Sequence, residues 1–504
     1  MKHLRFLLCL ALAVTLLTAC GPKGDGSASS SGGGSSVSSS GSGSDPEPAP
    51  APASLTLAAC LSDSFHPVLG TNRSNLTLAP LLYEPLFQLD ETFQPVPVLC
   101  SQAASADGLI WELTLREGIT FSDGSPLTGS VAADALNTAR QSARYAQRLR
   151  DVSSISGQGN VVTVTLVRAN GNLPALLDIP IASGTGDRPV GTGPYVLSET
   201  DGALAARSGW WQGKTLPVQT IRLTAASRSE DLVSSFSAGD IGLVDVDLMG
   251  TNAPGYSGSY QTWDYATTEL LYLGLNTQSG LCRAPEVRQA IARAIDRTSI
   301  VQVDFARHAV AAGLPVHPSS PLYNAAQAGT LGYSPQQSQA ALEQLRLTGR
   351  SVTLVVNTEN TAKVSAAQRI AAQLEAVGLT VHLSRLSYDS YVSALAAGNF
   401  DLYLGQVTLT GDFDLAPLLS SSGSLNYGRW QDALGDALLS AFQSAQGETR
   451  SKAASDLFAY LNQQTPIVPV CFKNGSVLTQ WSRLSGLSPV RGNVFYQLEN
   501  WKLS

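Results

Sequence analysis

The chain has 504 residues, of which 43% are hydrophobic and only 14% are charged, and its formal net charge is −7. A chain of this length and composition can form a globular body with more than one lobe. Lysine and arginine form no cluster along the body, which argues against nucleic-acid binding. The composition therefore indicates a large, acidic globular protein.

The N-terminus predicts export. Lys2 and Arg5 precede the apolar run 6–17, which is short for a membrane span and leads into small residues, so residues 1–19 are expected to form a signal peptide. The run 17–20, Leu-Thr-Ala-Cys, resembles the lipobox of bacterial lipoproteins. This resemblance implies a lipidated Cys20 on the outer face of the bacterial cytoplasmic membrane. An ordinary signal peptide with a chance cysteine, or an uncleaved anchor helix, is the alternative.

Residues 20–54 predict a tether. They are mostly Gly, Ser, Pro and Ala, a composition that buries no core. A flexible linker of roughly 30 residues has a root-mean-square reach of roughly 30 Å. From residue 55 onward no segment holds about 18 consecutive apolar residues, which predicts a soluble body.

The body contains four cysteines: Cys60, Cys100, Cys282 and Cys471. An even number in an extracytoplasmic protein allows two disulfides, and buried free thiols are equally compatible with the sequence. No C-x-x-C spacing occurs and histidines are few, so neither a metal site nor a cofactor is expected.

Short β-like runs alternate with amphipathic helical patterns from residue 54 onward, which indicates an α/β protein. Strands are predicted at 55–58, 109–115, 152–155, 161–167, 352–356, 379–383, 400–404 and 466–470. Helices are predicted at 285–296, 298–306, 335–347, 364–377, 388–397, 431–444 and 448–463. The run from 352 to 383 predicts a βαβ unit with parallel strands and a right-handed connection.

The chain lacks the sequence signatures of catalysis that we searched for. It has no G-x-S-x-G elbow, no H-E-x-x-H and no phosphate-binding G-x-x-x-x-G-K-[ST] loop. The glycine pairs at 184–186 and 191–193 are expected to form turns. No enzyme is predicted.

Several motifs together resemble one family. They lie at 82–87 (LYEPLF), 115–128 (LREGITFSDGSPLT), 190–195 (VGTGPY), 275–297 (with VRQAIARAIDR) and 465–469 (TPIVP). Their order is that of the family 5 solute-binding proteins, which serve peptide and nickel ABC importers. Arg288 and Asp296, within the fourth motif, are expected to have structural roles.

The resemblance implies a bilobed α/β fold of the periplasmic-binding-protein type (type II, cluster C), in which two lobes with mixed sheets are joined by two hinge crossings. The expected first lobe spans residues 55–270, the second spans 271–474, and residues 475–504 return to the first. The crossings are expected near 269–276 and 469–475. The implied function is capture of a peptide between closing lobes, as a monomer that delivers it to ABC permease and ATPase subunits.

The resemblance also suggests residues that contact the ligand: Leu69, Gly70, Thr71, Asn72, Met249, Tyr272, Asp412 and Phe472. Asp412 would pair with the N-terminal ammonium of a peptide. A surface loop, core packing and a helix cap are the respective alternatives for the 69–72 loop, Met249 and Asp412. Residues 406–410 lack the tryptophan and arginine common in peptide binders, which weakens the inference for dipeptides.

Three other functions are compatible with the sequence. The solute could be a sugar or a metal chelate instead of a peptide. The protein could be a sensor without a transport role, or, with less support, a surface hydrolase on the same scaffold. The sequence leaves the ligand and the disulfide pairing open.

Overall fold

The computed structural model describes residues 54–504 except 199–201 and 252. The predicted signal peptide, Cys20 and nearly all of the predicted tether lie outside these residues. The chain from residue 52 onward forms one compact unit. Its elements are arranged around several sheets.

The first sheet has the order β1–β10–β9–β8, with β1 (Leu55–Ala59) parallel to β10 (Thr220–Ala225). Its other strands are β9 (Ala203–Ala206) and β8 (Tyr195–Leu197), and helix α1 (Arg73–Leu82) packs beside it. Leu57 and Tyr195 belong to a buried cluster, here called the β1 core, that also contains Trp501 near the C-terminus. The first strand that the structure describes and the C-terminal segment therefore share one core.

The second sheet is antiparallel, in the order β4–β5–β7–β6, and α2 (Gly129–Gln141) covers it. Its strands are β4 (Cys100–Ala104), β5 (Ile110–Leu115), β6 (Val152–Gln158) and β7 (Val161–Leu166). Trp111, Leu113 and Leu115 alternate into its core as period-two patterning requires. The strands predicted at 152–155 and 161–167 form a hairpin, since β6 pairs with β7 across the turn at Gly159, where φ is 57°. We call this region the β5 subdomain.

The third sheet has the order β11–β17–β12–β16–β14–β15, and β13 also pairs with β17. The predicted βαβ unit is confirmed: β14 (Ser351–Asn357), α8 (Thr361–Ala376) and β15 (Thr380–Leu386) follow one another, and the two strands are parallel. The other strands are β11 (Leu243–Val246), β12 (Tyr260–Leu275), β13 (Ala309–Ala311), β16 (Leu402–Thr408) and β17 (Ile467–Gln480).

The remaining helices mostly cover this third sheet. They are α4 (Pro285–Ala294), α6 (Ala325–Gly329), α7 (Pro335–Gln344), α9 (Tyr388–Ala397), α10 (Ala416–Leu419), α11 (Ala433–Ser444) and α12 (Gly447–Gln464). Elsewhere lie α3 (Ser229–Ala238), β2 (Phe87–Leu89), β3 (Pro95–Pro97), β18 (Leu484–Ser485), β19 (Lys502–Leu503) and the short helices η1 (Leu173–Leu176), η2 (Leu281–Arg283) and η4 (Leu498–Asn500). Arg288 has the expected structural role, because its buried guanidinium donates to backbone carbonyls at Cys282 and Thr465.

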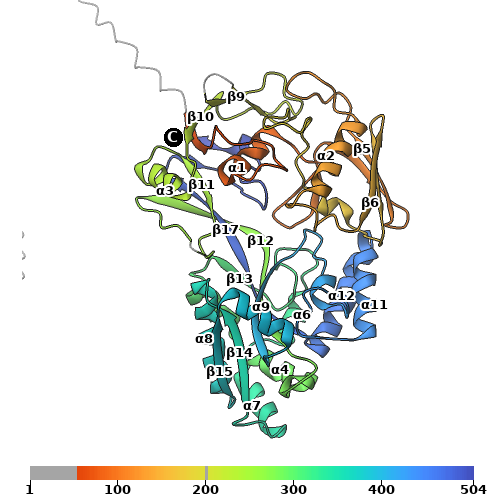
Figure 1. Cartoon of the computed structure of the whole chain (residues 1–504), viewed down its shortest axis with the longest axis vertical. Helices are drawn as coiled ribbons and strands as arrows, with labels where there is room; N and C mark the ends of the chain where they lie inside the picture. The colour runs from red at the N-terminus through yellow and green to blue at the C-terminus, as the bar shows by residue number, and fades with distance from the viewer. Residues whose placement is uncertain (1–53, 199–201, 252) are drawn as a thin grey trace, which may run out of the picture. The chain divides into compact units, whose positions relative to one another are not determined.

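Two long strands join the cores. Trp263 of β12 packs against the β1 core, whereas Leu273 of the same strand lies in the core beneath α4 and α8. Strand β17 also runs between these two cores, antiparallel to β12, and the two strands are paired along most of their length. Figure 1 shows both strands passing from the elements around the β1 core to those around α4 and α8. A bulge at Thr267 and Thr268 of β12 marks the passage.

The helix predicted at 298–306 is confirmed in position, but most of it is π-helical. The structure has one turn, α5 (Arg297–Ser299), followed by a π-helical turn, η3 (Ile300–Asp304). The Phe305 N–H donates to the Ile300 carbonyl, five residues back, at 3.2 Å. Asp304 is held by Arg369 and Ser365 of α8. These contacts come from a distant helix, so hydrophobic periodicity does not reveal them.

Burial of Lys363 is expected to make the stability of the protein depend on pH in the alkaline range. This lysine in the first turn of α8 is 6% exposed, and burial lowers the pKa of its amine to about 8 from 10.5. Between these values the unfolded chain binds more protons than the folded one, so stability should rise as the pH increases through this window. Lys363→Met should remove this rise, since methionine has no titratable group. Urea unfolding at about pH 7 and about pH 10 measures the change, and an unchanged pH dependence in the variant would contradict the prediction.

Candidate functional site

A buried lysine lies where β12 and β17 pass between the cores. The Lys473 amine is 2.6 Å from an Asp247 carboxylate oxygen and 2.9 Å from a Glu269 carboxylate oxygen, and its side chain is 5% exposed. Glu269 of β12 lies directly opposite Lys473 of β17, and Asp247 follows β11, the neighbouring strand. We call these three residues the lysine cluster.

The electrostatics of the lysine cluster keep the amine charged. Burial alone would lower the pKa of Lys473, but the carboxylates of Glu269 and Asp247 raise it above its ordinary value. The side chains of Asp247 and Glu269 are 36% and 22% exposed, and besides the lysine they accept hydrogen bonds from the Met249 N–H and the Gln406 amide, respectively. Two carboxylates on one lysine leave a net negative charge, which favours a cationic group of a ligand.

The loop after β11 connects the lysine cluster to the core beneath α4 and α8. The Met249 N–H donates to an Asp247 carboxylate oxygen at 3.1 Å, and the Met249 carbonyl accepts from the Asn360 amide at 2.9 Å. Asn360 caps the N-terminus of α8. Met249 packs, partly buried, against the core beneath α4 and α8.

The predicted loop 69–72 lies immediately before α1. Leu69 is 46% exposed, whereas Gly70 is buried and a Cβ there would lie 2.6 Å from the His66 carbonyl oxygen. Thr71 is exposed, and the Asn72 side chain caps α1. The next residue, Arg73, donates to the Asp245 carbonyl of β11 at 3.3 Å. Ligand contact by these residues and by Met249 stays a prediction.

Tyr272 and Phe472 lie on the other face of the sheet and are buried, with 4% and 0% exposure. The Tyr272 ring meets the Tyr403 ring edge-on at 5.7 Å, and Phe472 packs against His317 at 5.2 Å. Their contacts make both residues part of a core, and ligand contact by either stays a prediction.

Asp412 lies apart from the lysine cluster and is 1% exposed. One carboxylate oxygen accepts from the Asn170 and Gln443 amides at 2.8 and 2.7 Å, and the other accepts from the Thr410 hydroxyl at 2.5 Å. Neutral donors therefore occupy both oxygens. The predicted pairing of Asp412 with a ligand ammonium stays a prediction.

Sequence reasoning missed Lys473 and Glu269. A signal was nevertheless present, because each is a single charge next to a run of apolar residues, at 467–472 and 270–273 respectively. A charge at the edge of such a strand requires a partner. The pairing itself depends on the register of β12 against β17, which the sequence does not specify.

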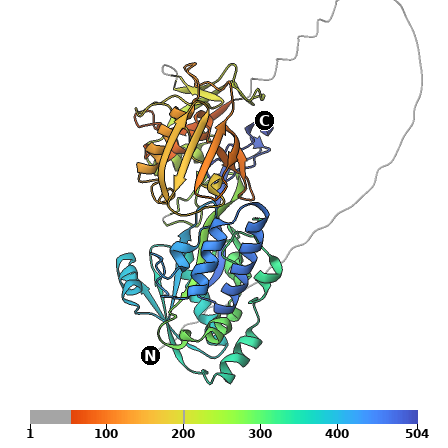
Figure 2. The same cartoon turned by 90° about the vertical axis from the view of Figure 1, so that its right-hand side faces the viewer.

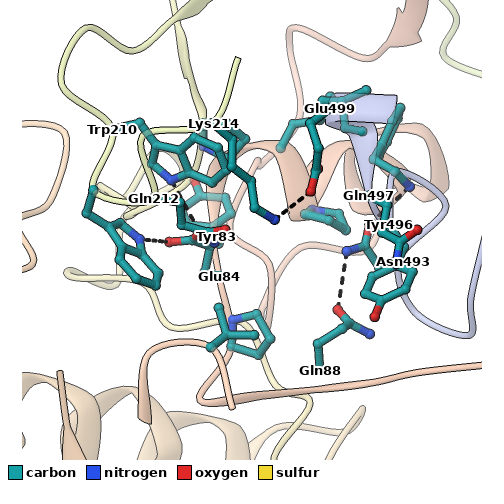
Figure 3. A pocket seen from close by; sticks show the side chains of 18 of the residues that line it. Tyr83, Glu84, Gln88, Trp210, Gln212, Lys214, Asn493, Tyr496, Gln497 and Glu499 are labelled. Carbon is teal, nitrogen blue, oxygen red and sulfur yellow. Dashed lines mark hydrogen bonds and ion pairs between the residues drawn. The ribbon is translucent and has the colours of Figure 1, made fainter. Parts of the chain in front are cut away.

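A second candidate site is a pocket of about 510 Å³ within the group of elements that contains the β1 core. It lies between the end of α1, the 210–216 loop and the C-terminal segment 493–499. Figure 3 shows Lys214 and Glu499 meeting over it, with 2.6 Å between their charged groups, and Gln88 bonded to Asn493. None of the predicted site residues lines this pocket.

The buried carboxylate of this pocket already has hydrogen-bond partners. Glu84 is 5% exposed and accepts hydrogen bonds from the Trp210 and Trp211 indoles and the Gln212 amide. Burial raises the pKa of the Glu84 carboxyl above its ordinary value. The three donors come from one loop, so Glu84 positions this loop.

All four body cysteines are buried and free. Among the described residues, no group of His, Cys, Asp and Glu is placed to hold a metal ion. Within the same part of the chain, no helix has both the length and the apolar character of a membrane span.

Comparison with known proteins places the chain in a family. The family model for bacterial extracellular solute-binding proteins, family 5 Middle, matches residues 94–427. The glutathione-binding protein GsiB of Shigella flexneri serotype 5b is 24% identical over 381 residues, covering 68% of this chain and 73% of GsiB. The periplasmic murein peptide-binding protein MppA of Escherichia coli K12 is 23% identical over 470 residues, covering 79% of this chain and 84% of MppA.

Solved structures agree on the fold. HbpA2 of Haemophilus parasuis superposes with a TM-score of 0.73 at 19% identity, covering 90% of this chain and 99% of HbpA2. The unliganded open form of MppA also gives 0.73, at 18% identity, covering 89% of this chain and 97% of that structure. The two cores joined by β12 and β17 are thus the lobes of a periplasmic-binding-protein-like fold. The chain belongs to the bacterial extracellular solute-binding proteins of family 5, the solute-binding components of ABC importers.

Proposed function

We propose that this protein captures a peptide beside the lysine cluster, between the two lobes, and delivers it to an ABC permease. The acidic excess at Asp247 and Glu269 is the observation that carries the choice of ligand, because it suits the free ammonium of a peptide. Thr71, Asn72 and Met249 would border the same space, since Arg73, which follows the first two, is bonded to β11, and Met249 is bonded to Asp247 just after that strand.

The relatives are consistent with a peptide as the ligand, but they do not determine the ligand. The names of two of them specify murein peptides and oligopeptides, whereas others specify glutathione and heme. One similar structure holds nickel bound to histidine. A peptide is our choice over a metal chelate because the lysine cluster offers carboxylates to an amine.

Binding here requires no bond-making step. Closure of the lobes would enclose the solute, exclude water and strengthen each polar contact made inside. Lipidation of Cys20 would hold the loaded protein on the outer face of the membrane, where the tether keeps it at high effective concentration near the permease. ATP is hydrolysed by the importer's own ATPase subunit.

The test is calorimetry on the protein without residues 1–19, using peptide pools, oligosaccharides and Ni(II) chelates. Glu269→Gln should weaken a free-amine peptide about tenfold, the loss of one charge-assisted contact, and an N-acetylated peptide much less. Heat from sugars or chelates but not from peptides would overturn the choice of ligand. Bound peptide recovered intact by mass spectrometry would exclude a hydrolase.

A further inference from the structure

The β5 subdomain is fastened to the second lobe by an ion pair. The Arg150 guanidinium, just before β6, lies 2.5 Å from a carboxylate oxygen of Asp414, in the loop between β16 and α10. The two side chains are 26% and 11% exposed, so water screens the pair only partly. Figure 2 shows the orange strands of this subdomain next to the blue helices α11 and α12.

A second fastening lies beside the ion pair. Asp412 accepts from Asn170 of the subdomain and from Gln443 of α11, so one carboxylate bridges both sides. The Gly171 N–H donates to the Gln443 carbonyl at 2.8 Å. A Cβ at Gly171 would lie 2.0 Å from the Ala445 carbonyl oxygen, so only glycine permits this approach of the two backbones.

An aromatic contact completes the interface. Phe93, in the turn between β2 and β3, meets Phe413 edge-on at 5.2 Å, and both rings are buried. Phe413 lies between the two aspartates, at a positive φ of 55°. The loop 410–414 therefore presents two carboxylates and a ring to the first lobe within five residues.

Charge explains why Arg150 matters. Burial, and then the nearby charge of Asp412, raise the pKa of the Asp414 carboxyl above its ordinary value. Arg150 opposes both effects and supplies the direct cation for this acidic pair. Without it, the loop would bring a partly buried carboxylate against the subdomain with no cation bonded to it, which is costly.

We propose that Arg150, Asn170, Asp412, Asp414 and Gln443 form a latch that holds the β5 subdomain on the second lobe and slows the escape of an enclosed solute. The lysine cluster lies on the strands that join the lobes, whereas the latch fastens the lobes through a separate contact. The solute part of this inference rests on the proposed function, but the fastening does not.

The test compares Arg150→Ala, Asp414→Asn and the double variant with Arg228→Ala. Arg228 is a matched control, because it also pairs with an aspartate, Asp231, at 3.3 Å, but at the start of α3 and with 74% exposure. Hydrogen exchange of residues 410–414 and 443–446, measured without added solute, should accelerate about tenfold in both single variants and no further in the double variant. The control should differ from wild type by less than about twofold.

Stopped-flow dissociation of a bound peptide is the second readout. Arg150→Ala should release the peptide about tenfold faster, and Arg228→Ala at the wild-type rate. The latch is overturned if hydrogen exchange of these residues is unchanged in Arg150→Ala. It is also overturned if the double variant exchanges faster than either single variant by the product of their effects. Accelerated exchange with an unchanged release rate overturns its role in retention. If no peptide binds wild type, the proposed function and the retention role fail together, and exchange alone decides the fastening.

Discussion

Replacement of Lys473 by methionine is expected to lower the free energy of unfolding by about 3 kcal/mol, because it leaves Asp247 and Glu269 side by side without a cation. The lysine is 5% exposed and its amine holds both carboxylates within 2.9 Å. Methionine preserves most of the packing of the aliphatic chain, so the loss reports the charge. Urea unfolding followed by circular dichroism measures it.

Lys452→Met is the matched control. Lys452 also has a carboxylate partner, Asp456, at 2.6 Å, but the two side chains are 79% and 51% exposed. Its replacement should change the free energy of unfolding by less than about 0.5 kcal/mol. Equal effects of the two substitutions would show that the lysine cluster has no special role in holding β11, β12 and β17 together.

Local patterning predicted much of the fold. Helices α8 and α9 lie within a few residues of their expected ends, because apolar spacing and Gly378 and Gly398 at their C-terminal ends are local signals. The family motifs added the bilobed arrangement, which the comparisons support. The π-helical turn at Ile300–Asp304 was missed because a contact with α8 holds it.

The site was harder to predict than the fold. The loop 69–72 and Met249 were expected to contact the ligand, and this stays a prediction; Arg73, next to the loop, is bonded to Asp245 of β11, and Met249 to Asp247 just after it. The lysine cluster depends on the register between strands about 200 residues apart in sequence, which no local pattern specifies. A carboxylate such as Asp412 has the same sequence appearance whether it binds a ligand or bridges two parts of the fold.

Asp412→Asn separates these two roles. One carboxylate oxygen accepts from the Asn170 and Gln443 amides and the other from the Thr410 hydroxyl, which can turn to accept from the new amide. With the side chain 1% exposed, the loss of these charge-assisted hydrogen bonds should cost about 2 kcal/mol of unfolding free energy. Thermal or urea unfolding of the variant measures this cost.

Peptide binding by the same variant decides what Asp412 does. Because neutral donors already occupy its carboxylate, we expect Asp412→Asn to weaken a free-amine peptide and its N-acetylated form by the same factor, through the loosened latch. A carboxylate that paired with the ligand ammonium would instead make the loss specific to the free amine, since only that ligand would leave a charge unpaired. A selective loss with unchanged stability would therefore return Asp412 to the ligand site and remove it from the latch.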